Sequence, residues 1–178
     1  MEQILEKTYA KFWDRVGAYI LDGIIVGFIS FALNYLNITQ FKSFLIYLPI
    51  AIIGILYKPV MEYKYGATVG KMLLNLRVID ENGSNIDFEK SLLRSLIVIT
   101  PALLYIPTHY LAFQNSYILS ADGFFEFSNR VAFTYPTMSL FTNLFSIVFI
   151  VDGIMMASDS VKKRSLKDRM AKTFVIKN

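Results

Sequence analysis

Two aspartates, Asp22 and Asp152, stand inside long apolar segments of this sequence, in the similar settings LDGI and VDGI. An ionised side chain costs about 2.5 to 3.5 kcal/mol at the centre of a membrane helix, so it normally faces other protein groups and finds a partner there. Arg15 precedes Asp22 by about two helical turns, which places both on one helix face. Arg94 begins another apolar segment, and Glu62 ends one. We therefore expect these residues to form one charge cluster at the inner leaflet.

Two kinds of chemistry are open to such a cluster. In one, the carboxylates bind or relay a proton or an alkali cation. In the other, the ion pairs only hold the helices together. An acid beside an arginine stays ionised, whereas a desolvated acid without a cation takes up a proton more readily. We expect Asp22 to lie close to Arg15 or Arg94, because an unpaired carboxylate at that depth is costly.

Enzymatic chemistry fits the sequence poorly. Two intramembrane aspartates can share a proton, as in membrane aspartyl proteases, but the G-x-G-D motif of those enzymes is missing. The single histidine, His109, lies near the outer end of its apolar segment, far from both aspartates. Cysteine is absent, which excludes disulfides, thiolate metal sites and cysteine nucleophiles. We expect no enzymatic activity, no cofactor and no metal site.

The charges are positioned by four apolar segments. Hydrophobic residues make up 54% of the 178 residues and charged residues only 18%, and a helix of about 20 apolar residues is long enough to cross a bilayer. The expected spans are 16–36, 43–61, 92–113 and 138–157. Lys58, near the end of the second span, is expected to snorkel to the interface. The sequence predicts one domain over 1–178, an all-α membrane protein with four transmembrane helices.

The distribution of basic residues predicts the orientation. Lys42 is the one basic residue between the first two spans, and Arg130 is the one between the last two. Apart from Lys58 and Arg94, which lie inside the second and third spans, all other Lys and Arg fall before the first span, in the loop 62–91 or in the tail 158–178. This distribution indicates that both chain ends are cytoplasmic. The net charge of +4 reflects these retained loops, so no nucleic-acid binding is expected.

The loop 62–91 carries a strand signal. The run LRVID is followed by Asn82 and Gly83 and then by SNID, and Asn-Gly between strand-like runs is typical of a hairpin. A lone hairpin is marginally stable in water, and TFVIK in the tail also has strand composition. The sequence predicts a small cytoplasmic β-hairpin or three-stranded sheet.

The same loop contains GATVGK, which is compared with a phosphate-binding P-loop. That motif needs four residues between its glycines and Ser or Thr after its lysine, whereas here there are three, and Met72 follows. The favoured interpretation is a glycine-hinged turn at the membrane surface, with Lys71 facing lipid head groups.

These segments together resemble the RDD family of bacterial membrane proteins, named for one arginine and two aspartates. FWDRVGAYILDGIIV carries the arginine and first aspartate, GATVGKMLLNLRVIDENG is similar to the G-x-T-x-G-K segment, and KKRSLKDRMAKTFVI is similar to the closing pattern. The matched positions are Arg15, Asp22, Gly66, Thr68, Gly70, Lys71, Arg94, Arg164, Asp168 and Thr173. Asp168 is taken as the second aspartate, although Asp152 matches an acidic position often seen in the last span. Lys167 stands where histidine is common, which weakens a proton relay through the tail.

The resemblance implies a protein of the bacterial cytoplasmic membrane with two candidate functions. One is a small transporter of a cation, proton or small solute, with Asp22 and Asp152 lining the path and a homo-oligomer helping to enclose it. The alternative is a non-transporting adaptor or regulator whose cytoplasmic loop and basic tail bind a partner protein or anionic lipid. The expected partners are thus the lipid bilayer, a second copy of the chain and a cation or proton.

Overall fold

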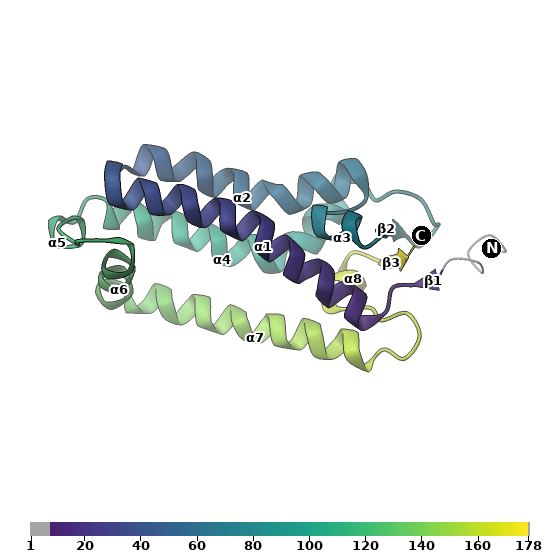
Figure 1. Cartoon of the computed structure of the whole chain (residues 1–178). Coiled ribbons are helices and arrows are strands. Elements are labelled where there is room, and N and C mark those ends of the chain that lie inside the picture. Colours follow the sequence, from purple (N-terminus) through teal and green to yellow (C-terminus); the bar gives the residue numbers. More distant parts are fainter. Residues whose placement is uncertain (1–7, 178) are drawn as a thin grey trace.

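Four long helices run alongside one another and form most of the molecule (Figure 1). The structure, a computed structural model, describes residues 8–177 apart from the side chains at 139 and 142. The helices are α1 (Phe12–Leu36), α2 (Phe44–Tyr65), α4 (Phe88–Ala112) and α7 (Pro136–Ser158). All four are long and apolar enough to cross a membrane, which confirms the predicted fold class.

Three of these helices extend past the predicted spans at one end of the bundle. α1 begins at Phe12, α4 begins at Phe88, and α2 continues to Tyr65. Hydropathy marks only the part of a helix that lies in lipid, whereas the added turns carry charges and pack against polar structure. The Asp87 carboxylate caps the start of α4 by accepting from the Lys90 backbone N–H at 2.7 Å. Gly66 ends α2 with a left-handed φ of 70°.

A small sheet lies at this end of the bundle, called here the sheet end. Its strands are β1 (Thr8–Tyr9), β2 (Leu76–Asp80) and β3 (Thr173–Lys177), antiparallel in the order β1-β3-β2. Two short helices accompany it, α3 (Val69–Leu73) and α8 (Leu166–Met170). Val78 and Val175 pair across β2 and β3, and both are fully buried in a cluster with Ala18 of α1. The sheet is thereby seated on the first membrane helix.

The predicted three-stranded sheet is confirmed, but its third strand differs from the expected one. The SNID segment forms only an isolated bridge between Asn85 and Ile79. The Asp80 carboxylate accepts from the backbone N–H groups of Asn82 and Ser84, which tightens the turn. Ile86 then buries its side chain under the sheet, and the chain enters α4 at once. β1 takes the free edge of β3 instead.

The opposite end, called here the loop end, is closed by helices. A π-helical turn, η2 (Asn37–Phe41), prolongs α1, while α5 (Ser116–Leu119) and α6 (Phe124–Thr134) follow α4. α6 lies across the helix ends in Figure 1. Its Phe127 and Val131 pack into a buried cluster with Tyr47 and Phe113. This end therefore has its own apolar core, separate from that of the sheet.

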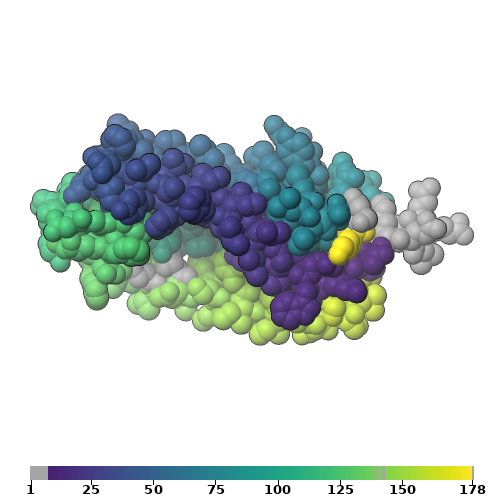
Figure 2. Space-filling view, viewed as in Figure 1, coloured from purple at the N-terminus to yellow at the C-terminus, as the bar shows by residue number. Residues whose placement is uncertain are grey.

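The outer surface of the bundle is apolar. Phe28 of α1 is 71% exposed, Ile53 of α2 69% and Ile150 of α7 60%. Such a surface suits lipid rather than water. Figure 2 shows α1 and α7 bordering one face, with the surface hollowed between them.

Candidate functional site

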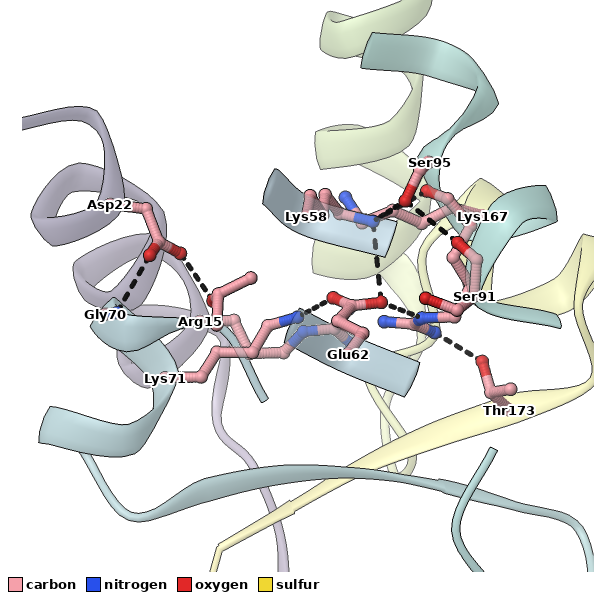
Figure 3. A network of polar contacts seen from close by, with 12 residues as sticks. Arg15, Asp22, Lys58, Glu62, Gly70, Lys71, Ser91, Ser95, Lys167 and Thr173 are labelled. Carbon is pink, nitrogen blue, oxygen red and sulfur yellow. Dashed lines mark hydrogen bonds and ion pairs between the residues drawn. The ribbon is translucent and has the colours of Figure 1, made fainter. Parts of the chain in front are cut away.

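Charged side chains from five helices meet at the sheet end of the bundle (Figure 3). We call this group the ion network. It consists of Arg15 of α1, Lys58 and Glu62 of α2, Lys71 of α3, Arg94 of α4 and Asp168 of α8. The side chains of Glu62, Arg94 and Asp168 are fully buried. Buried charges of this kind are tolerated only when they are paired.

Arg94 is bound by two carboxylates. Its Nε donates to Glu62 Oε2 at 2.8 Å, and its Nη1 donates to Asp168 Oδ1 at 2.5 Å and to the Thr173 hydroxyl. Ser91, one turn earlier on α4, donates to the Pro59 carbonyl of α2 at 2.7 Å. α2 and α4 are thus held together next to the guanidinium.

Asp168 links the tail to two membrane helices. It accepts from Arg15 Nη2 of α1 and from Arg94 Nη1 of α4, both at 2.5 Å. It also caps α8 by accepting from the Ser165 backbone N–H at 2.9 Å. Burial opposes ionisation of this carboxyl, but Arg94 and Arg15 outweigh burial and hold the pKa of Asp168 below its ordinary value. Asp168 is therefore ionised at neutral pH.

Glu62 is shared by three cations. Arg94 and Lys71 bind it closely, whereas the Lys58 Nζ lies 3.5 Å from its Oε2. Lys58 also donates to the Arg94 carbonyl and to Ser95 Oγ, each at 3.0 Å. Burial lowers the pKa of Lys71, and Glu62 opposes that shift. Lys71 faces Glu62 rather than the lipid head groups, so the expected orientation of Lys71 is wrong.

The GATVGK segment docks on Asp22 of α1. The Thr68 hydroxyl donates to Asp22 Oδ2 at 2.6 Å, and the Gly70 N–H donates to Oδ1 at 2.8 Å. Tyr57 of α2 donates its hydroxyl to Oδ1 at 2.8 Å as well. A Cβ at Gly70 would lie 2.2 Å from the Ala18 carbonyl oxygen, so only glycine allows α3 to approach α1 this closely.

The expected pairing of Asp22 with Arg15 or Arg94 is wrong. The hydroxyls of Tyr57 and Thr68 and the Gly70 amide satisfy this carboxylate, and all three are neutral. Arg15 turns instead toward Asp168. These three donors satisfy both oxygens of the half-buried Asp22 side chain without a cation. Asp22 is an anchoring point for α3.

Asp152 of α7 forms a separate ion pair. It accepts from the Lys167 backbone N–H at 3.1 Å and pairs with the Lys167 ammonium. The sequence predicts a single charge cluster. The structure has three separate groups instead: Asp22 with its neutral donors, the Asp152–Lys167 pair and the ion network. Arg164 lies outside the network too, with its guanidinium 5.1 Å from the centre of the Phe174 ring.

The expected position of Lys58 is also wrong. Its ammonium points into the ion network and not toward the membrane interface. A signal was present, because Lys58 and Glu62 stand four residues apart on a helix, the spacing of side-chain ion pairs. No group of three or more His, Cys, Asp or Glu with metal-binding placement occurs in the described part of the chain.

Comparison with curated proteins and with solved structures gave no match. The family model described as the RDD family matches residues 9–172. That stretch includes the arginine and the two aspartates analysed above, Arg15, Asp22 and Asp168, as well as the GATVGK segment. Since the match covers nearly all of the sequence, the chain belongs to the RDD family.

Proposed function

We propose that this protein is a small membrane transporter that couples the movement of a solute or cation to proton transfer, with Lys58 as the proton-carrying group. The observation that carries the proposal is the position of Lys58 in the ion network. Ionisable residues inside membrane helices commonly mark transport pathways and proton relays.

Lys58 can lose its proton without leaving a buried acid unpaired. Glu62 keeps Arg94 at 2.8 Å and the ion pair with Lys71 in either state of the lysine. Neutral Lys58 retains polar neighbours in the Arg94 carbonyl and Ser95 hydroxyl. Loss of an acid's only cation leaves an uncompensated buried charge, and this arrangement avoids that. An arginine in the same place would hold its proton permanently.

A cavity lies about one helical turn from this lysine. It has a volume of about 230 Å³ and lies between α1, α2 and α4, where Gly54 and Val98 are among its lining residues. Gly54 lies about one helical turn from Lys58 on α2, and Val98 lies about one turn from Ser95 on α4. A solute in the cavity and a proton on Lys58 would therefore be neighbours, as coupling requires.

The distribution of charge supports an orientation with the sheet end in the cytoplasm of a bacterium. Lys42 and Arg130 are the basic residues near the loop end, and the remaining described Lys and Arg fall toward the sheet end. Cytoplasmic loops carry such an excess of Lys and Arg. The proton on Lys58 would then exchange near the cytoplasmic surface.

Proton flux into liposomes tests the proposal. Purified protein would be reconstituted with a pH-sensitive dye inside, and pH, Na⁺ and K⁺ gradients would be applied in turn. Lys58→Arg keeps the positive charge but removes a proton that can be released, so we expect at least a tenfold loss of flux. The control is Lys64→Arg, at an exposed position of the same helix, which should leave flux unchanged. Undiminished flux in a folded Lys58→Arg protein would contradict the assignment.

A second candidate function, that of a non-transporting adaptor or regulator, is favoured by the basic surface of the tail. Lys162, Arg169 and Lys172 are exposed beside the sheet, where they suit anionic lipid or an acidic partner protein. If the wild-type protein moves no protons under pH, Na⁺ or K⁺ gradients, proton transport coupled to these cations is rejected and the adaptor function is favoured.

A further inference from the structure

The cavity between α1, α2 and α4 exists because small residues face one another there. Ala51 and Gly54 of α2 and Ala102 of α4 are among its lining residues. A Cβ added at Gly54 would meet no neighbouring atom within 4 Å. Protein interiors are usually close-packed. The space of about 230 Å³ that these small residues line is partly open to the outside of the bundle, and it leaves room for a small molecule.

The cavity contains an unsatisfied hydrogen-bond acceptor. Asn34 Nδ2 donates to the Ser30 carbonyl at 2.8 Å, and Oδ1 of the same side chain is buried without a partner in the described part of the chain. Both residues line the cavity. Buried polar atoms nearly always have a partner, so this oxygen is suited to accept from a bound molecule.

The remaining lining limits the class of that molecule. Tyr47 and Tyr105 are the other polar residues of the lining, and it contains no Asp, Glu, Lys, Arg or His. A charged ligand would lose its hydration without gaining a counter-charge. Ile50, Ile55 and Val98 supply an apolar wall. The lining thus suits a neutral molecule with an apolar body.

We infer that this cavity binds a small neutral amphiphile, an apolar body of aromatic size with one hydroxyl or N–H that donates to Asn34 Oδ1. An apolar protein cavity of about 150 Å³ binds benzene, so the larger volume here accommodates a benzene ring with a few added atoms. The identity of this ligand as the transported solute rests on the proposed function, whereas its binding does not.

Phenol and anisole are a matched pair of probes. They share the ring, but only phenol can donate to Asn34 Oδ1. Binding would be measured by isothermal titration calorimetry on protein in nanodiscs, with empty nanodiscs subtracted for partition into lipid. We expect saturable binding of one phenol per chain, at least tenfold tighter than anisole. Equal binding of the two probes, or no saturable binding of phenol, would overturn the inference.

Two variants with one control locate the site. Gly54→Leu fills the cavity and should abolish saturable phenol binding. Gly153→Leu on α7, where an added Cβ also meets nothing within 4 Å, should leave binding unchanged. Asn34→Leu removes the acceptor and should bring the affinity for phenol down to that for anisole. Phenol binding by Gly54→Leu as tight as by the wild type would overturn the inference, since another site would then be responsible.

The binding and flux assays distinguish this inference from the proposed function. Phenol binding that depends on Gly54 and Asn34, with no proton flux in liposomes, would support the cavity site and reject transport. Proton flux that depends on Lys58, with no specific phenol binding, would support transport and reject this ligand class.

Discussion

Arg94 is the residue at which the membrane part and the sheet end are joined. Its guanidinium binds Glu62 from α2, Asp168 from α8 and Thr173 from β3. Bonds between charged groups are the stronger class of hydrogen bond. An arginine with two carboxylates uses several of its fixed donor directions at once. Loss of either acid therefore leaves the buried guanidinium with one carboxylate in place of two, and the network with one negative charge fewer.

The first prediction concerns Asp168→Asn. Removing one partner of a buried pair typically costs about 3 to 5 kcal/mol, and Asp168 serves two arginines. The free energy of unfolding, measured by denaturant titration in detergent, should fall by that amount. The control is Asp159→Asn, whose ion pair with Arg169 is 3.6 Å long and partly exposed. Surface pairs contribute about 0 to 1 kcal/mol, so a similar loss in both variants would contradict the prediction.

The pH dependence of stability should follow from the same residue. The pKa of Asp168 is lowered on folding, so the stability it contributes is fully present above its unfolded pKa of about 3.9. That stability is lost as the pH falls through the lower folded pKa. Asp168 should thus cause no change between pH 5 and 8 and a decline in acid. Unfolding curves for the wild type and Asp168→Asn should converge as the pH is lowered below about 4.

A double-mutant cycle should show that Asp22 and Arg94 act independently. The donors to Asp22 come from Tyr57, Thr68 and Gly70, and none of these contacts involves Arg94. We expect Asp22→Asn and Arg94→Gln to add within about 0.5 kcal/mol. The matched cycle of Glu62→Gln with Arg94→Gln should show a clear interaction energy. Rescue of Asp22→Asn by Arg94→Gln would contradict the observed geometry.

At this scale the sequence predicts four members of the ion network, but it predicts neither the inward position of Lys58 and Lys71 nor all of the pairings. Charge within or beside apolar segments, or the family motif, points to Arg15, Glu62, Arg94 and Asp168. Position along a helix gives the depth of a residue, and depth alone does not decide which neighbour a long side chain reaches. The predicted partner of Asp22 is wrong because hydropathy gives no sign that GATVGK folds back onto α1.

Among the elements, the contact of α3 with α1 is the one that depends on a single glycine. Gly70 lies where a side chain would strike the backbone of α1 at Ala18 and Asp22. The same contact allows the Gly70 amide to reach the Asp22 carboxylate. Two further contacts depend on this position of α3. Thr68 reaches Asp22, and Lys71 reaches Glu62.

The prediction at this scale is that Gly70→Ala destabilises the protein far more than Gly23→Ala. The new methyl group at Gly70 would lie 2.2 Å from one backbone atom and 2.8 Å from another, and overpacking costs about 1 to 3 kcal/mol or more. A Cβ at Gly23 meets nothing within 4 Å, so alanine there should be neutral or stabilising. Thermal unfolding in detergent measures both. Equal melting temperatures would mean that α3 does not pack as described.

Strand composition could be read from the sequence more easily than strand partners. The composition of LRVID and TFVIK predicts two strands, and these segments pair as β2 and β3. β1 is only two residues long, too short to produce an alternating pattern. Its pairing with β3 joins distant parts of the chain, which local patterns do not report.

For the whole molecule, the prediction is that the sheet end lies in the cytoplasm and the loop end outside. The chain has no cysteine, so a single introduced cysteine is a clean probe. Asn85→Cys and Lys177→Cys at the sheet end should resist an impermeant maleimide in intact cells, because basic segments are retained inside. Ser120→Cys at the loop end should react. Permeabilised cells provide the control, in which all three should label, and labelling of Asn85→Cys in intact cells would overturn the topology.

The number and approximate place of the membrane helices could be predicted because lipid imposes a length and a composition on each of them. The short helices α3, α5, α6 and α8 leave no comparable signal, since their places depend on contacts with other elements.

The tail binds Arg15, Arg94 and β1. These contacts set the order in which the parts of the protein assemble. Domains are built as the chain emerges from the ribosome, from the N-terminus onward. In the sequence, Asp168 and β3 come after Arg15, Arg94 and β1. The nascent chain therefore contains the two arginines before their shared acid, and the edge strand β1 before its partner. The four helices can enter the bilayer early, but they cannot reach their native arrangement until the tail docks. A chain interrupted before Asp168 therefore contains Arg15 and Arg94 without the acid that pairs with both of them in the finished molecule.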